Sequence, residues 1–140
     1  LISAIHRLPM PTIAKVRGYC VGGGMGVAMA CDLLLASETA KFTQNFAVRG
    51  MSLDSGSSYT LPRRVPMNRA KELAFLAEFI DANTADSYGL VNRVVPEAEL
   101  DALVDKWASS IEQLSRHFCG TSFGRRGRSA ISELVDKGFR

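Results

Sequence analysis

Short apolar runs, separated by glycine, proline and small polar residues, recur along the first hundred positions of the chain. Runs of three to six residues bounded by such turn residues are typical of strands. They predict strands at residues 13–16, 33–36, 41–43 and 90–95. The run at 33–36 is apolar throughout, which indicates a fully buried strand.

Apolar residues at helical spacing fill most of the intervals between these strands. The predicted helices cover residues 22–31, 57–64, 69–79, 84–88 and 99–114, and residues 2–8 form the end of another helix that Pro9 and Pro11 close. The helix at 99–114 has the clearest stripe, with apolar side chains at positions 100, 103, 104, 107 and 111. Strands that alternate with helices predict an α/β fold with mostly parallel or short strand pairings.

The composition is that of an ordinary globular protein, with 46% hydrophobic and 22% charged residues, which excludes disorder as the default. The longest apolar run, residues 19–31, contains four glycines and falls short of the roughly 18 apolar residues that a membrane span requires. No secretory signal opens the sequence, so neither secretion nor membrane association is expected. The three cysteines form no CxxC pair, which favours a reducing, cytoplasmic setting.

Charge distinguishes the two ends of the chain. Residues 115–140 hold six basic and two acidic side chains, a net charge of +4. Residues 1–114 hold 11 basic and 12 acidic side chains, a net charge of −1. The near-neutral body gives no reason to expect a nucleic-acid partner. Residues 118–127 have no clear period, and residues 129–139 are compatible with a short helix. We therefore predict a core of residues 1–114 and a divergent basic segment, residues 115–140.

Three consecutive glycines, Gly22, Gly23 and Gly24, lie between an apolar run and a predicted helix. Glycine lets the backbone approach a ligand closely, and a helix N-terminus offers unpaired N–H groups at the positive end of its dipole. Such a turn can bind an anion or a developing oxyanion. It can equally be a tight, closely packed turn with no ligand. The spacing matches neither the dinucleotide-binding fingerprint nor the P-loop.

Asp54 is the second candidate, in a loop of serine and glycine that precedes the predicted helix at 57–64. Taken alone, its position favours a helix cap, and general acid–base catalysis is the functional alternative. Neither histidine, His6 or His117, has metal-type partners nearby in the sequence, so no metal site is expected. The serines at 55, 57 and 58 lack the frame of a nucleophile elbow.

Residues 13–32 resemble the signature of the crotonase (enoyl-CoA hydratase/isomerase) superfamily. Further motifs follow in the family's order at residues 40–44, 54–63, 69–73, 85–92 and 94–96, so the resemblance spans residues 2 to about 114. It implies a partial crotonase-like spiral of ββα units followed by C-terminal helices. Chains of the family are much longer at the N-terminus, so the sequence resembles an N-terminally truncated relative.

The resemblance also implies an acyl-CoA thioester as the substrate, with coenzyme A as part of that substrate and no separate cofactor. One backbone N–H of the family's oxyanion hole matches Gly23. The neighbouring positions implied in substrate binding are Gly22, Gly24, Met25 and Phe46. Family members form trimers or paired trimers, which implies a homo-oligomer.

Two departures from the family pattern bear on the reaction. The two glutamates of typical hydratases match Gly26 and Phe46, and neither residue can activate water. In several isomerases of the family, a single carboxylate occupies the position of Asp54. The resemblance therefore implies conversion of 3-enoyl-CoA to 2-enoyl-CoA, within fatty acid metabolism, with Asp54 as the acid–base group and Gly23 as an oxyanion donor. The alternative is a catalytically silent truncated relative that binds acyl-CoA or serves as an assembly partner.

Overall fold

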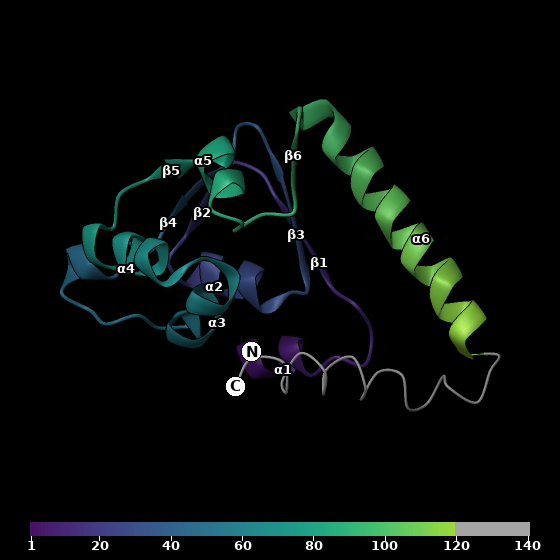
Figure 1. The fold of residues 1–140 in the computed structure, drawn as a ribbon, viewed down its shortest axis with the longest axis horizontal. Coiled ribbons are helices and arrows are strands. Elements are labelled where there is room, and N and C mark those ends of the chain that lie inside the picture. The colour runs from purple at the N-terminus through teal and green to yellow at the C-terminus, as the bar shows by residue number, and fades with distance from the viewer. Residues whose placement is uncertain (120–140) are drawn as a thin grey trace. The chain divides into compact units, whose positions relative to one another are not determined.

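The fold was obtained as a computed structural model of the 140-residue chain, which describes residues 1–119 (Figure 1). The chain divides into a larger unit, Leu1–Val104, and a smaller one, Asp105–Arg140, whose described part is helical. The predicted helix at 129–139 lies outside the described residues. The division into residues 1–114 and 115–140 stays a prediction. No helix within residues 1–119 is both long enough and apolar enough to cross a bilayer.

The larger unit alternates short strands with helices. In chain order the elements are α1 (Ile2–His6), β1 (Ile13–Val16), β2 (Tyr19–Val21), α2 (Gly23–Ala30), β3 (Leu33–Ser37), β4 (Lys41–Thr43), η1 (Ala47–Arg49), α3 (Ser57–Arg64), α4 (Met67–Leu76), β5 (Ile80–Asp81), α5 (Ala82–Ser87), β6 (Arg93–Val95), η2 (Glu97–Glu99) and α6 (Leu100–Cys119). The α/β class predicted from the sequence is confirmed.

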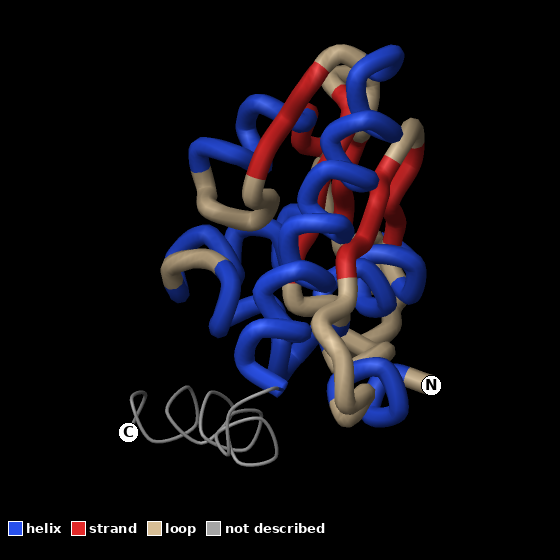
Figure 2. The backbone as a smooth tube through the Cα atoms, turned by 90° about the vertical axis from the view of Figure 1, so that its right-hand side faces the viewer, coloured by secondary structure: helices blue, strands red, loops and turns tan. Residues whose placement is uncertain are grey.

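The strands form two three-stranded sheets, shown in red in Figure 2. One sheet has the order β1-β3-β6 and is parallel throughout, with Ile13 opposite Leu33 and Leu35 opposite Arg93. In the other, β2 pairs parallel with β4, and β4 pairs antiparallel with the short strand β5. The central strand β3 is buried from Leu34 to Ser37, as its unbroken apolar run predicts. Mostly parallel pairing is therefore confirmed.

Helix α2 lies in the hydrophobic core of the larger unit. Its residues are glycine, alanine, methionine and valine, so no face of it is polar, and Met25 is fully buried. Helix α3 packs directly against it (Figure 1). Leu34, Phe42 and Leu61 are completely buried in the same core, which joins both sheets to α2 and α3. The first turn of α2 is thereby held by packing on several sides.

Two element boundaries differ from the prediction for identifiable reasons. Helix α4 ends at Leu76 instead of residue 79, because Ala77 adopts a left-handed conformation with φ +53°. Strand β6 begins at Arg93 instead of residue 90. Just before it, the Asn92 side-chain oxygen accepts a hydrogen bond from Leu34 N at 2.7 Å, in the place of a strand carbonyl. Strands β2 and β5 and the short helices η1 and η2, each of two or three residues, were not predicted.

Candidate functional site

The glycine turn, residues 22–24, connects β2 to α2. Gly22 has φ +50°, and its N–H donates to Thr43 O at 2.9 Å. A Cβ at Gly22 would lie 2.8 Å from Asn45 Oδ1. The positive φ favours glycine at this position, whereas the Asn45 amide is the far end of a side chain that can move aside.

The first turn of α2 has no side-chain cap among the described residues. Its first internal hydrogen bond runs from Gly26 N to Gly22 O at 3.0 Å, so helix geometry leaves the N–H groups of Gly23, Gly24 and Met25 without helical partners. Gly23 is half-buried and Gly24 is exposed. The side chain of Met25 belongs to the core, which leaves only its backbone to face a ligand. The turn can offer N–H donors to an oxyanion.

Asp54 lies exposed in the loop before α3. Its Oδ1 accepts a hydrogen bond from Ser55 N at 2.6 Å, and its carbonyl oxygen accepts one from Ser57 N at 2.9 Å. The N-cap of α3 is Gly56, with no side-chain cap. The helix-cap interpretation of Asp54 is therefore wrong: two consecutive left-handed residues, Ser55 and Gly56, separate its side chain from the helix start.

The Asp54 loop and helix α2 are in close contact through Ser55. A Cβ at Gly26 would lie 2.6 Å from Ser55 O and 2.8 Å from Ser55 Cβ, and one at Gly23 would lie 3.2 Å from Ser55 Oγ. Ser57 Oγ, which is buried and has no partner among the described residues, lies 3.3 Å from the same Gly26 position. The structure therefore brings the residue beside Asp54 onto the glycine turn.

Phe46 joins the glycine turn to an apolar pocket. Its ring lies against Gly22, where a Cβ would be 3.6 Å from Cζ, and only 8% of the residue is exposed. Phe46 also lines an open pocket of about 370 Å³, together with Ala47, Met51, Ser52, Leu53, Ser58, Ala74 and Phe75. Phe46 was the only predicted site residue in this lining. The others could not be found from the sequence, because η1 and α4 meet only in the folded chain.

Arg64, at the end of α3, holds the opposite end of α2. Its Nε donates to Met29 O at 3.1 Å, and its Nη2 donates to the carbonyl oxygen of Cys31. Burial lowers the pKa of the Arg64 guanidinium. A cation at the C-terminus of α2 complements the negative end of its dipole. Arg64 was not predicted, and it fixes the helix whose other end is the glycine turn.

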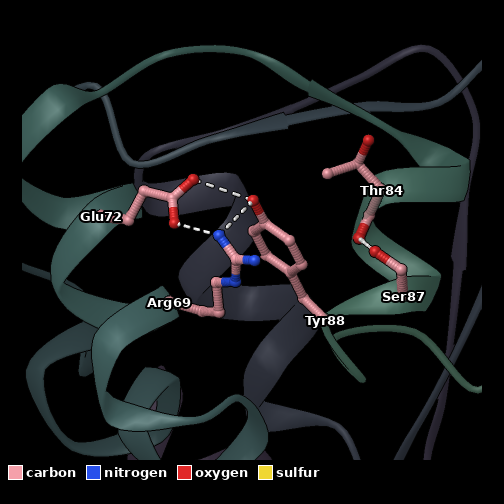
Figure 3. A network of polar contacts seen from close by, with 5 residues as sticks. All are labelled: Arg69, Glu72, Thr84, Ser87 and Tyr88. Atoms are coloured by element: carbon pink, nitrogen blue, oxygen red, sulfur yellow. Dashed lines mark hydrogen bonds and ion pairs between the residues drawn. The ribbon is translucent and has the colours of Figure 1, made fainter.

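A second polar network holds α4, which carries the pocket residues Ala74 and Phe75 (Figure 3). Arg69 pairs with Glu72 at 2.6 Å, and the Tyr88 hydroxyl donates to Glu72 Oε1 at 2.8 Å. The Arg69 guanidinium also lies 4.4 Å from the centre of the Tyr88 ring. The hydrogen bond from Arg69, followed by that from Tyr88, holds the pKa of Glu72 below its ordinary value. The network ties α4 to the residue that follows α5.

The two histidines belong to helices α1 and α6. His6 ends α1, where its ring makes an edge contact with Tyr59 at a centroid distance of 6.5 Å, and His117 belongs to α6. Among residues 1–114, whose side chains the structure describes, no three histidine, cysteine or acidic side chains gather closely enough to hold a metal ion.

Comparison with known proteins identifies the family. The sequence model of the enoyl-CoA hydratase/isomerase family matches residues 1–120. The chain belongs to the enoyl-CoA hydratase/isomerase family. The resemblance carried by the glycine turn and the later motifs is thereby confirmed.

The curated relatives of this family member differ in their named reactions. A Rhodobacter capsulatus protein named "Probable enoyl-CoA hydratase" is 35% identical over 139 residues, which make up 99% of this chain and 49% of that protein. The 4-chlorobenzoyl coenzyme A dehalogenase-1 of an Arthrobacter species is 34% identical over 120 residues, 86% of this chain and 44% of that protein. The chain thus spans about half the length of the curated relatives it matches.

Solved structures of the same family share the fold. A structure from Thermobifida fusca YX, described as "a putative enoyl-CoA hydratase" in complex with CoA, has a TM-score of 0.83 and 30% sequence identity. The match covers 99% of this chain and 51% of that chain. The prediction of a partial crotonase fold is confirmed.

Proposed function

We propose that the protein acts on acyl-CoA thioesters and moves their double bond from the 3,4 to the 2,3 position, with Asp54 as the acid–base group. The observation that carries this proposal is the contact of Ser55, the neighbour of Asp54, with Gly23 and Gly26 of α2. It puts a carboxylate loop beside the backbone N–H groups of a helix N-terminus. Proton transfer next to a thioester requires such a base and donors for the developing negative charge.

In the proposed reaction, the Asp54 carboxylate removes a proton from C2 of the 3-enoyl thioester. Negative charge moves onto the thioester oxygen, where the Gly23 N–H and the α2 dipole stabilise the dienolate. The same carboxyl group returns the proton at C4, so a single acid–base group is sufficient. The loss of one oxyanion donor typically costs about 3 kcal/mol of transition-state stabilisation. The acyl chain would occupy the pocket beside Phe46.

Hydration of the substrate double bond is disfavoured, because neither position where the family resemblance expects a glutamate carries a carboxylate. At Gly26, even a methyl group would come within 2.6 Å of Ser55 O, so the backbone occupies the space that a carboxylate would need. At Phe46, a buried ring stands beside the glycine turn. Neither position supplies a base to activate water. Coenzyme A is then part of the substrate, and we further propose no separate cofactor, a homo-oligomeric state and a cytoplasmic location.

A second candidate function rests on the similarity to the dehalogenase. A lone carboxylate can also act as a nucleophile. In that reaction Asp54 would displace a halide from the ring of a halobenzoyl-CoA, and water would then hydrolyse the ester formed with Asp54 and release the product. The remaining alternative is a silent relative that binds acyl-CoA without turnover or serves as an assembly partner.

The test is an isomerisation assay with 3-enoyl-CoA on the wild-type chain, Asp54→Asn and the matched control Asp86→Asn, an exposed residue of α5. We expect turnover in the wild type and in Asp86→Asn, and its loss in Asp54→Asn. Halide release from a halobenzoyl-CoA with no isomerisation would favour the second candidate. Binding of acyl-CoA with neither reaction would favour the silent relative.

A further inference from the structure

Ser55 has an unusual backbone conformation. Its φ is +52°, and Ser55 and Ala77 are the two non-glycine residues with positive φ within the described chain. A left-handed conformation costs a non-glycine residue roughly 1–2 kcal/mol. Glycine would adopt the conformation without that cost, and the next residue, Gly56 with φ +71°, is a glycine. Residues with this kind of strain cluster at active sites and ligand-binding loops.

The Ser55 side chain faces the first residue of α2. Its Oγ lies 3.2 Å from the position of a Cβ on Gly23. No hydrogen bond joins this hydroxyl to another residue of the described chain, whereas the Ser55 N–H donates to Asp54 Oδ1 at 2.6 Å. Ser55 and Gly23 are both half-buried. The hydroxyl is therefore a free donor within reach of a ligand that enters the glycine turn.

The distances allow one ligand oxygen to accept hydrogen bonds from both groups. Covalent geometry puts a Cβ about 2.5 Å from its own backbone nitrogen, so Ser55 Oγ lies within about 5.7 Å of Gly23 N. An acceptor oxygen stands about 2.9 Å from an N–H donor and about 2.8 Å from a hydroxyl donor. One oxygen placed between Gly23 N and Ser55 Oγ can satisfy both distances.

We propose that Ser55 is a further catalytic residue of this site, whose hydroxyl donates a hydrogen bond to the thioester oxygen held by Gly23 N–H. This inference rests on the proposed function, since it concerns the same oxygen. It adds a side-chain donor to a site for which the sequence suggested only backbone donors. It also gives Ser55 two tasks, because its own N–H holds the Asp54 carboxylate.

The experiment compares Ser55→Ala and Ser55→Gly with the control Ser87→Ala, whose hydroxyl donates to Thr84 O at 2.8 Å in α5 (Figure 3). Ser55→Gly keeps the backbone conformation and the N–H to Asp54, and removes only the side chain. The first readout is kcat and KM for isomerisation. The second is the infrared carbonyl stretch of bound 2-enoyl-CoA labelled with ¹³C at the thioester carbon, which needs no turnover.

We expect kcat to fall about 100-fold in both Ser55 variants with little change in KM, as for other oxyanion donors. The carbonyl stretch of the bound thioester should move to higher frequency in both, and Ser87→Ala should match the wild type. Wild-type kcat and carbonyl frequency in Ser55→Gly would overturn the proposal. The proposal would also be overturned if the wild-type protein did not bind the thioester, or bound it without shifting its carbonyl frequency from that of the free thioester.

Failure of the proposed function gives a different pattern. If Asp54→Asn retained turnover, the acid–base assignment would be wrong, but a carbonyl shift that depends on Ser55 would still support the hydroxyl donor. If Asp54→Asn abolished turnover while Ser55→Ala and Ser55→Gly kept both readouts unchanged, the isomerase would stand and the role of Ser55 would fall.

Discussion

Ser55 packs so closely against Gly26 that a Cβ on Gly26 would lie 2.6 Å from the Ser55 carbonyl oxygen. This contact joins the loop of the candidate acid–base group to the helix of the candidate oxyanion donor. It also explains why the second turn of α2 requires a residue without a side chain. The same helix offers an internal comparison, because nothing lies within 4 Å of a Cβ at Gly24.

Gly26→Ala should therefore destabilise the fold by about 1–3 kcal/mol, the usual range for overpacking a filled core. Gly24→Ala should leave stability unchanged or raise it by up to about 1 kcal/mol, because alanine is the better helix former. Urea unfolding of both variants measures the difference. Equal stability of the two variants would show that the loop is not held against α2 as described.

Arg64 should contribute more to stability than its neighbour Arg63. Replacing Arg64 with Met leaves the C-terminal carbonyls of α2 without their donors, so Arg64→Met should cost about 2 kcal/mol, the range of hydrogen bonds to charged groups. Arg63 is exposed, and within the described residues its hydrogen bond and ring contact are both with Tyr59 of its own helix, so Arg63→Met is the matched control. Thermal unfolding of both variants checks the prediction, which a similar Tm for the two would refute.

The hydrogen bond from the Tyr88 hydroxyl to Glu72 should stabilise the protein at neutral pH and lose this effect at acid pH. A carboxyl group whose pKa is lowered by folding, as that of Glu72 is, stabilises the protein above its unfolded pKa and loses this effect as the pH falls through the folded pKa. Tyr88→Phe removes one cause of the shift. Its urea midpoint should be lower than the wild type's at pH 7, and the two midpoints should converge at an acid pH below the ordinary pKa of glutamate. Tyr59→Phe is the control, and a constant gap between wild type and Tyr88→Phe at both pH values would contradict the assignment.

Cys20 should resist thiol reagents in the folded protein. Burial raises the pKa of its thiol to about 11, and only 6% of the residue is exposed. At pH 8 its thiolate fraction is negligible, and the thiolate is the reactive form. Cys31 is half-buried and should be alkylated before Cys20. Peptide mapping after brief iodoacetamide treatment distinguishes the two sites, and faster labelling of Cys20 would show that its strand is open.

Local sequence signals predicted most of the fold. The unbroken apolar run of β3 and the turn residues around α3 are properties of neighbouring positions, and both elements appear where expected. The left-handed turn at Ala77 and the Asn92 side chain that pairs with β3 depend on contacts formed only after folding. The neighbouring residues in the sequence therefore do not predict either feature.

The candidate site divides in the same way. The glycine run at residues 22–24 and Asp54 could be singled out from their own neighbourhoods, because a glycine run before a helix and a carboxylate in a serine-rich loop are visible in the sequence, whereas the choice of Gly23 within that run came from the family resemblance. The contact of Ser55 with α2 could not, since it joins two distant segments. The pocket wall at Phe75 was hidden because that ring lies outside the buried stripe of α4 and is 72% exposed.

The central claim is that Asp54 moves the proton at C2 of a bound enoyl thioester. Proton NMR of 3-enoyl-CoA in D₂O measures deuterium entering at C2 and C4, whether or not the equilibrium favours the product. We predict exchange with the wild type and with Asp86→Asn, and none with Asp54→Asn. Exchange at the wild-type rate in Asp54→Asn would contradict the account.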